Sequence, residues 1–173
     1  MPIIILMLGL HIAQNHKNIN HLKNQLSPES KNPNKKKEVF KKGQRIPYIL
    51  LKDIQGNSHS IPDKYNDTLL LLFSTTCKAC IKNMGNWKQL VALSSEKNQK
   101  ILGISKSPVN DTVSILKENK LYIPVVSIYN DQKMKDHFKF YRYPQTILID
   151  SSGRIKNIWI GVLDPNLLET RKT

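Results

Sequence analysis

The chain has 173 residues, and its 27 lysines and arginines against 13 aspartates and glutamates give it a net charge of +14. This length fits one typical domain, and the 2 cysteines are too few for a disulfide-dense secreted scaffold or a four-cysteine zinc site. A content of 39% hydrophobic residues argues against disorder of the whole chain. Every apolar run is shorter than the roughly 18–20 residues that a bilayer span needs.

The positive charge does not indicate a nucleic-acid partner. Most basic residues are lysine, whereas arginine, whose guanidinium recognises bases and phosphates through paired hydrogen bonds, is scarce. The sequence also lacks a basic stripe interleaved with aromatic residues, on which unpaired bases would stack. We therefore expect no nucleic acid among the partners, and only a weak attraction to anionic surfaces.

The chain begins with an apolar segment, residues 1–13, followed by a polar and basic stretch, residues 14–42. The apolar length fits the core of a signal peptide or an anchor, and the stretch after it resembles a flexible, solvated tether. Two features argue against export. No basic residue precedes the apolar run, and the positive-inside bias would place the basic flank after the run in the cytoplasm. We predict a location in the cell envelope or periplasm, with this segment as a membrane tether. A cytoplasmic protein with a short unstructured end is the alternative.

Residues 43–173 have the pattern of a packed domain. Residues 46–51 are a short apolar stretch that precedes a turn at residues 55–57. Residues 68–73 are a continuous apolar run of strand length, which indicates a strand buried on both faces of a sheet. Residues 77–94 carry apolar side chains three and four positions apart, which predicts a helix with one apolar face.

The remaining segments alternate in the same way and end in a hairpin signal. Strands are predicted at 101–105 and 125–128, helical segments at 111–119 and 131–138, hairpin strands at 146–150 and 155–160, and a short terminal helix around Leu167 and Leu168. Strands that alternate with helices and then form a hairpin predict an α/β domain with a central mixed β-sheet flanked by helices.

Two cysteines, Cys77 and Cys80, stand directly after the buried strand, in a Cys-Lys-Ala-Cys motif at the start of the predicted helix. Two intervening residues within one helical turn bring the sulfurs close enough to form a disulfide. Unpaired backbone N–H groups and the helix dipole favour a thiolate at Cys77, and Lys78 adds a positive charge. Because Cys80 lies one turn deeper, we expect Cys77 to attack and Cys80 to resolve the mixed disulfide.

Structural cysteines, or half of a metal site, are the alternative interpretation of this motif. The histidines complete no convincing metal site: His11, His16 and His21 are five residues apart, a spacing that does not align them on a helix face. His59 and His137 are single residues. A strand, a Cys-x-x-Cys motif and a helix in succession are a fairly specific redox signal, so we predict a redox-active pair.

With this motif in place, the chain resembles a known family over roughly residues 42–168. It is similar to the bacterial membrane-anchored or periplasmic thiol–disulfide oxidoreductases, which have a thioredoxin-like fold and belong to the alkyl hydroperoxide reductase/thiol-specific antioxidant superfamily. The resemblance is carried by residues 42–47 and 51–57, Leu-Phe-Ser-Thr-Thr-Cys-Lys-Ala-Cys at 72–80, Ile-Leu-Gly-Ile-Ser at 101–105, and Tyr-Pro-Gln-Thr-Ile-Leu-Ile-Asp at 143–150 followed by Gly-Arg-Ile at 153–155. The resemblance implies a thioredoxin-like fold with a central mixed β-sheet.

The resemblance also implies roles for residues outside the cysteine pair. Pro144 matches the family's cis-proline, which packs against the active-site disulfide, and Tyr143 would then lie beside the sulfurs and shape what approaches. Thr76 replaces the aromatic residue that usually precedes the first cysteine, and Leu71 stands where thioredoxin has a buried acid. Without that carboxylate, proton transfer to and from Cys80 would need water or another group.

The family often has an acidic residue shortly after the motif, where this chain has Ile-Lys-Asn at 81–83. The resemblance therefore implies a site more electropositive than is usual in the family. We expect a stabilised thiolate in the reduced form, and therefore a disulfide more oxidising than that of thioredoxin, whose potential is about −270 mV. A peroxidase is disfavoured. Peroxiredoxins need a threonine three residues before the reactive cysteine and a proline four residues earlier, where this chain has Ser74 and Leu70.

We therefore predict a thiol–disulfide oxidoreductase that exchanges disulfides with partner proteins through Cys77 and Cys80, with Pro144 holding the substrate-facing loop. Its partners would be protein thiols and disulfides and an upstream electron donor or acceptor protein. Its redox group would be the disulfide of the two cysteines, with no dissociable cofactor and no bound metal. Two alternatives stay open: a copper chaperone of the same fold that uses His137 as a distal ligand, and a thioredoxin-like interaction domain without turnover.

Overall fold

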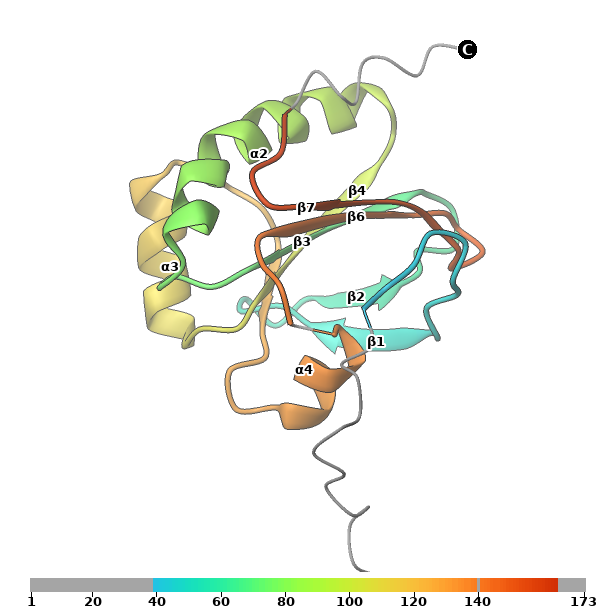
Figure 1. The fold of residues 1–173 in the computed structure, drawn as a ribbon, viewed down its shortest axis with the longest axis horizontal. Coiled ribbons are helices and arrows are strands. Elements are labelled where there is room, and N and C mark those ends of the chain that lie inside the picture. Colours follow the sequence, from blue (N-terminus) through green and yellow to red (C-terminus); the bar gives the residue numbers. More distant parts are fainter. Residues whose placement is uncertain (1–38, 140, 165–173) are drawn as a thin grey trace, which may run out of the picture. The chain divides into compact units, whose positions relative to one another are not determined.

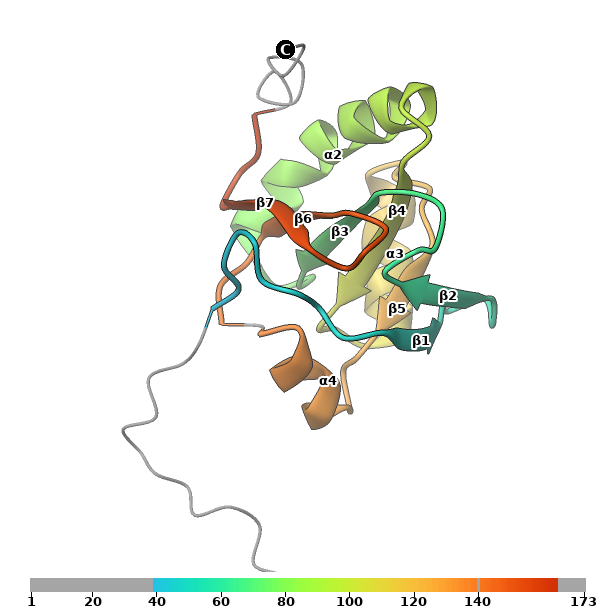
Figure 2. The same ribbon diagram turned by 90° about the vertical axis from the view of Figure 1, so that its right-hand side faces the viewer.

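The computed structural model describes residues 39–139 and 141–164. Five strands form a mixed sheet in the order β5-β4-β3-β6-β7, and β1 and β2 form a separate antiparallel pair. The elements are β1 (Ile49–Lys52), β2 (Ser58–Ile61), β3 (Thr68–Phe73), α2 (Lys78–Glu96), β4 (Lys100–Ser105), α3 (Val109–Glu118), β5 (Val125–Ser127), α4 (Gln132–His137), β6 (Gln145–Ile149) and β7 (Ile155–Ile160). Helices α2 and α3 cover one face of the large sheet, and α4 and the β1–β2 hairpin lie on the other (Figures 1 and 2).

Strand β3 lies at the centre of the large sheet and is buried on both faces. All six of its residues are buried, and it pairs in parallel with β4 and antiparallel with β6. Leu70 and Leu72 pack into the core on the hairpin side, whereas Leu69, Leu71 and Phe73 pack into the core under α2 and α3. The continuous apolar run therefore reflects a strand with two dry faces, as its sequence predicts.

Helix α2 is fixed to the sheet by one large side chain. Trp87 is fully buried, and its ring centroid lies 5.9 Å from that of Phe73 on β3. Its indole Nε1–H donates a hydrogen bond of 2.9 Å to the Thr146 hydroxyl on β6. Because a buried indole N–H needs an acceptor, this bond lets the helix bury Trp87 without leaving a polar atom unpaired. The helix is thereby tied to two neighbouring strands.

The predicted elements agree with the observed ones to within three residues at each end. Strand β2 is not among the predicted strands, because its sequence Ser-His-Ser-Ile offers one strongly apolar side chain, the fully buried Ile61. The predicted terminal helix at Leu167 and Leu168, the apolar segment 1–13 and most of the predicted tether, residues 14–42, lie outside the described residues. Within residues 39–139 and 141–164, no helix is both long and apolar enough to cross a membrane.

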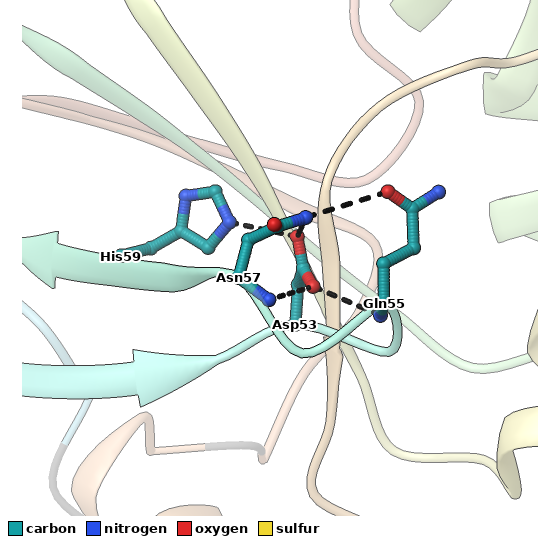
Figure 3. A network of polar contacts seen from close by, with 4 residues as sticks. All are labelled: Asp53, Gln55, Asn57 and His59. Atoms are coloured by element: carbon teal, nitrogen blue, oxygen red, sulfur yellow. Dashed lines mark hydrogen bonds and ion pairs between the residues drawn. The ribbon is translucent and has the colours of Figure 1, made fainter.

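The turn between β1 and β2 is built around a buried carboxylate, that of Asp53 (Figure 3). The carboxylate accepts the backbone N–H groups of Gln55 and Asn57, both at 2.9 Å, and the Asn57 side-chain amide at 3.2 Å. It also lies 2.8 Å from Nε2 of His59. The next residue, Ile54, donates its backbone N–H to Val125 at 2.8 Å, which ties the turn to the edge strand β5.

Burial of Asp53 by itself would raise the pKa of its carboxyl. The hydrogen bonds from His59, Asn57 and Gln55 outweigh that effect and lower the pKa of Asp53 from 3.8 to about 2. A carboxyl whose pKa is lowered by folding stabilises the folded state above its unfolded-state pKa, and this stabilisation disappears as the pH falls through the folded-state value. The turn is thus a source of acid sensitivity.

We predict that Asp53→Asn lowers the free energy of unfolding by on the order of 1–2 kcal/mol at neutral pH, because hydrogen bonds to a charged acceptor are lost. The difference from the wild type should shrink as the pH falls from about 4 towards 2, where the wild-type carboxylate is itself protonated. Chemical denaturation at several pH values measures both effects. Asp136→Asn, on the exposed surface of α4, is the control. A difference that stays constant down to pH 2 would contradict the assignment.

Candidate active site

The cysteine motif begins helix α2 at the carboxyl end of β3. Cys77 is the N-cap residue of the helix, with φ −94° and ψ 108°, and its sulfur accepts the backbone N–H of Cys80 at 3.2 Å. A serine or aspartate oxygen usually makes this bond at a helix start. The first turn of α2 contains no acidic residue, so nothing there opposes the positive end of the helix dipole. The first turn therefore supplies a hydrogen bond and a favourable dipole to negative charge on the Cys77 sulfur.

The two cysteines differ in their exposure to solvent. Both are free thiols; Cys77 is half-buried, whereas Cys80 is fully buried in the core under α2. Burial, and then a hydrogen bond from the Cys80 thiol to the Cys77 sulfur, raise the pKa of Cys80 far above its usual value. The structure thus pairs one accessible sulfur with one shielded thiol. The predicted roles require this asymmetry, and the roles themselves stay predictions.

The segment before β6 lies against the accessible sulfur. The carbonyl oxygen of Tyr143 is 3.9 Å from the Cys77 sulfur, within reach of its thiol. The peptide bond between Tyr143 and Pro144 is cis, as the family resemblance implies, and Pro144 is buried. The Tyr143 side chain is half-buried and packs against the core on both faces of the sheet. The structure therefore brings Tyr143 and Cys77 together from positions 66 residues apart.

The other two predicted site residues flank Cys77 on the surface. Thr76 and Lys78 are both exposed, and Lys78 is the first residue of α2. The Thr76 hydroxyl is 3.0 Å from that of Ser74, which makes this edge of the site polar. Leu71, in place of thioredoxin's buried acid, is fully buried.

A cluster of hydroxyl groups, which no sequence motif indicated, holds the loop between β3 and α2. The Ser107 hydroxyl lies 3.2 Å from that of Ser74, and it accepts bonds of 2.9 Å from both the backbone N–H and the hydroxyl of Thr75. Ser107 is two residues beyond β4, whose last residue, Ser105, is opposite Phe73 in the parallel pair. A parallel pairing of the two predicted strands would have indicated this cluster, because it brings the residues that follow each strand together.

These loops border a pocket of about 350 Å³ beside Cys77. The pocket lies where β3, β4 and β5 end, the edge at which parallel sheets commonly bind ligands. Its lining residues are Ser74, Thr75, Thr76, Lys106, Ser107, Pro108, Asp111, Tyr129 and Tyr143. Two of these residues adjoin Cys77. Thr76 precedes it in the chain, and the carbonyl oxygen of Tyr143 contacts its sulfur. The pocket is therefore part of the rim of the candidate active site.

His137, the distal ligand of the copper-chaperone alternative, is the last residue of α4. Its Nε2 is buried without a hydrogen-bond partner, its ring meets that of Phe138 edge-on at 5.0 Å, and burial lowers its pKa. In the part of the chain that the structure describes, no group of three or more His, Cys, Asp or Glu side chains is placed to hold a metal ion. The described residues therefore do not support that alternative.

Several curated proteins are similar to this chain. The sporulation thiol-disulfide oxidoreductase A of Bacillus subtilis is 26% identical over 125 residues, which are 70% of this chain and 75% of that protein. The thiol-disulfide oxidoreductase ResA of Geobacillus kaustophilus is 26% identical over 129 residues, 73% of this chain and 74% of that protein. These names agree with the activity predicted from the Cys-x-x-Cys motif.

Solved structures and a family model complete the comparison. The crystal structure of StoA from Bacillus subtilis matches 72% of this chain and 95% of its own, at 22% identity and a TM-score of 0.61. The thioredoxin domain of a thiol-disulfide oxidoreductase from Bacteroides vulgatus matches 76% of this chain and 97% of its own, at 24% identity and a TM-score of 0.64. These likenesses confirm the predicted thioredoxin-like fold. Because the AhpC/TSA family model matches residues 42–158, well over half of the sequence, the chain belongs to the AhpC/TSA family.

Proposed function

We propose that the protein is a thiol–disulfide oxidoreductase that exchanges disulfides with partner proteins through Cys77 and Cys80. The observation that carries this proposal is the difference between the two sulfurs. Cys77 is accessible and accepts a backbone N–H at the start of α2, and the fully buried Cys80 lies one helical turn away. Membership of the AhpC/TSA family and relatives named as thiol–disulfide oxidoreductases support the same activity.

Reduction of a partner disulfide takes two exchange steps. The Cys77 thiolate attacks one partner sulfur, a mixed disulfide forms, and the other partner sulfur leaves as a thiolate that takes a proton from solvent. Cys80 then gives up its proton and attacks the Cys77 sulfur, which releases the second partner thiol and leaves a disulfide between Cys77 and Cys80. The partner gains two electrons, both from the protein, and two protons, one from solvent and one from the Cys80 thiol. An electron donor protein restores the dithiol, and the same steps in reverse oxidise a partner.

The residues around Cys77 would shape the approach of the partner. Tyr143 presents its backbone carbonyl to the sulfur, and buried Pro144 holds that segment at the start of β6. Thr76 and Lys78 form the exposed edge on the other side of Cys77. A small threonine in place of an aromatic side chain leaves the sulfur more open to a bulky partner.

We place the protein in an oxidising compartment, in the cell envelope or periplasm. A catalytic disulfide can be maintained there, whereas thiols in the cytosol are kept reduced. The apolar residues 1–13 would act as the export signal or tether.

The proposed direction of electron flow follows from the charges at the site. Lys78 and the absence of acidic residues from the first turn of α2 favour the reduced, thiolate-bearing form, which makes the disulfide an oxidant.

We predict that the two cysteines fail in different ways when substituted. Cys80→Ser should accumulate a mixed disulfide with a peptide disulfide, because attack by Cys77 is intact and resolution is lost. Cys77→Ser should reduce turnover to the uncatalysed background and form no adduct, because the remaining thiol is buried. Mass spectrometry under non-reducing conditions measures both. The double variant is the control, and an adduct formed by Cys77→Ser would contradict the proposed roles.

The raised pKa of Cys80 leads to a second prediction. In the reduced, folded protein at about pH 7–8, iodoacetamide should label Cys80 more slowly than Cys77 by about tenfold or more, because Cys80 is both buried and protonated. Labelling of Cys80 should increase only at a pH well above the pKa of an ordinary cysteine, because the pKa of Cys80 is raised. Peptide mapping by mass spectrometry gives the two rates, and the protein in guanidinium, where both thiols are exposed, is the reference. Equal rates in the folded protein would count against the assignment.

A redox titration tests the electron-flow proposal. Equilibration with glutathione buffers, scored by alkylation of the remaining thiols, should show a two-electron transition less negative than about −270 mV, the potential of thioredoxin. Lys78→Gln should shift the transition to a more negative value, since it removes a positive charge from the first turn. A potential at or below that of thioredoxin would overturn the proposed direction, and failure to form the disulfide would overturn the catalytic function.

A further inference from the structure

Lys106 provides a fixed positive charge in the pocket beside Cys77. It follows β4 directly, and its backbone N–H donates to the Phe73 carbonyl at 3.0 Å, which anchors it at the end of β3. Its ammonium lies 5.5 Å from the centroid of the Tyr143 ring, within the range of a cation–π contact. The side chain is half-buried, and it makes no ion pair with any of the residues that the structure describes. Its charge therefore remains available to a ligand in the pocket.

The surroundings of Lys106 favour an anionic over a cationic occupant. Lys106 lines the pocket and is half-buried, so its charge is less screened by solvent than one on the open surface. The carboxylate of Asp111, which also lines the pocket, is exposed on the first turn of α3, where solvent screens it. The hydroxyls of Ser74, Thr75 and Ser107 make the floor polar. The half-buried ammonium of Lys106 therefore outweighs the exposed carboxylate of Asp111.

The pocket is within reach of a residue next to the reacting cysteine of a bound partner. Tyr143 lies between Cys77 and the pocket. Its carbonyl oxygen is 3.9 Å from the Cys77 sulfur, and the centroid of its ring is 5.5 Å from the Lys106 ammonium. Consecutive Cα atoms of an extended chain are about 3.8 Å apart. A side chain one or two residues from a partner sulfur bonded to Cys77 is therefore within reach of this pocket.

We propose that this pocket is a subsite for an acidic side chain of the partner protein, one or two residues from its reacting cysteine, with Lys106 as the specificity-determining residue. The proposal rests on the proposed function, because it names the class of partner that would form a mixed disulfide with Cys77. The carboxylate would pair with the Lys106 ammonium in a pocket whose wall is polar. Such a pair at a partly exposed rim typically contributes to selectivity and to the association rate more than to affinity.

The test compares two peptide disulfides that differ only in glutamate or glutamine two residues from the cysteine. The second-order rate constant for their reaction with the reduced full-length protein should be about three- to fivefold higher for the glutamate peptide, the range for a partly exposed ion pair. Lys106→Gln should abolish this ratio, and Lys106→Arg should retain it. Asp111→Asn should increase the ratio, and about 0.5 M salt should reduce it.

Lys82→Gln is the matched control, because Lys82 is an exposed lysine on α2 that does not line the pocket. It should leave the ratio unchanged. A wild-type ratio of one would overturn the subsite. So would an equal slowing of both peptides by Lys106→Gln, since Lys106 would then act on the active-site sulfur and not on the partner. Failure of the proposed function has a different signature, in which neither peptide reacts with the wild-type protein.

Discussion

The burial of β3 on both faces is the constraint on which the candidate site depends. Its neighbours are fixed by register: Phe73 lies opposite Ser105 of β4, and Leu72 lies opposite Gln145 of β6. The segments that adjoin these three strand ends are the cysteine loop, the loop with Lys106, and the Tyr143–Pro144 segment. Since backbone pairing determines where each segment meets the others, the apolar core sets the geometry around the two sulfurs.

Helix α2 transmits the same constraint to the cysteines themselves. Trp87 contacts β3 and β6, and its side chain packs in the same core as Cys80 and Leu71. The helix therefore starts at the carboxyl end of β3, with Cys80 turned into the core and Cys77 at the margin of the core. One turn of helix separates a fully buried thiol from a half-exposed one, so the packing of α2 produces the chemical difference between them.

Much of this arrangement can be predicted from the sequence, and what cannot has a common physical cause. The apolar run at residues 68–73 and the hydrophobic spacing after Cys77 are local signals, and both elements form where they are expected. Strand β2 is missed because its pairing with β1 and the Asp53 turn, and not its own apolar content, hold it in place. Lys106 and Ser107 are missed because their importance depends on the register of two strands.

The resemblance to a family supplies a different kind of information. The cis bond before Pro144 has no local signal in the sequence, and only the match of the surrounding residues to the family implied it. At 26% identity to the relatives, about three quarters of the matched positions differ, so the resemblance carries the fold further than it carries individual side chains. Side chains such as Thr76 and Lys106 are therefore interpreted from their contacts.

The absence of a carboxylate at Leu71 changes which step of the exchange is demanding. In the reduced protein the Cys80 thiol is surrounded by the core, the Cys77 sulfur and the backbone of Ser74, and its pKa is raised mainly by burial. Attack by Cys77 needs no proton to leave the core, whereas resolution does. Removing that proton without a neighbouring base costs free energy, since charge must form in a dry environment. In the proposed exchange, resolution by Cys80 is therefore the more demanding step, and contacts made by the partner at the pocket rim would act while the mixed disulfide exists.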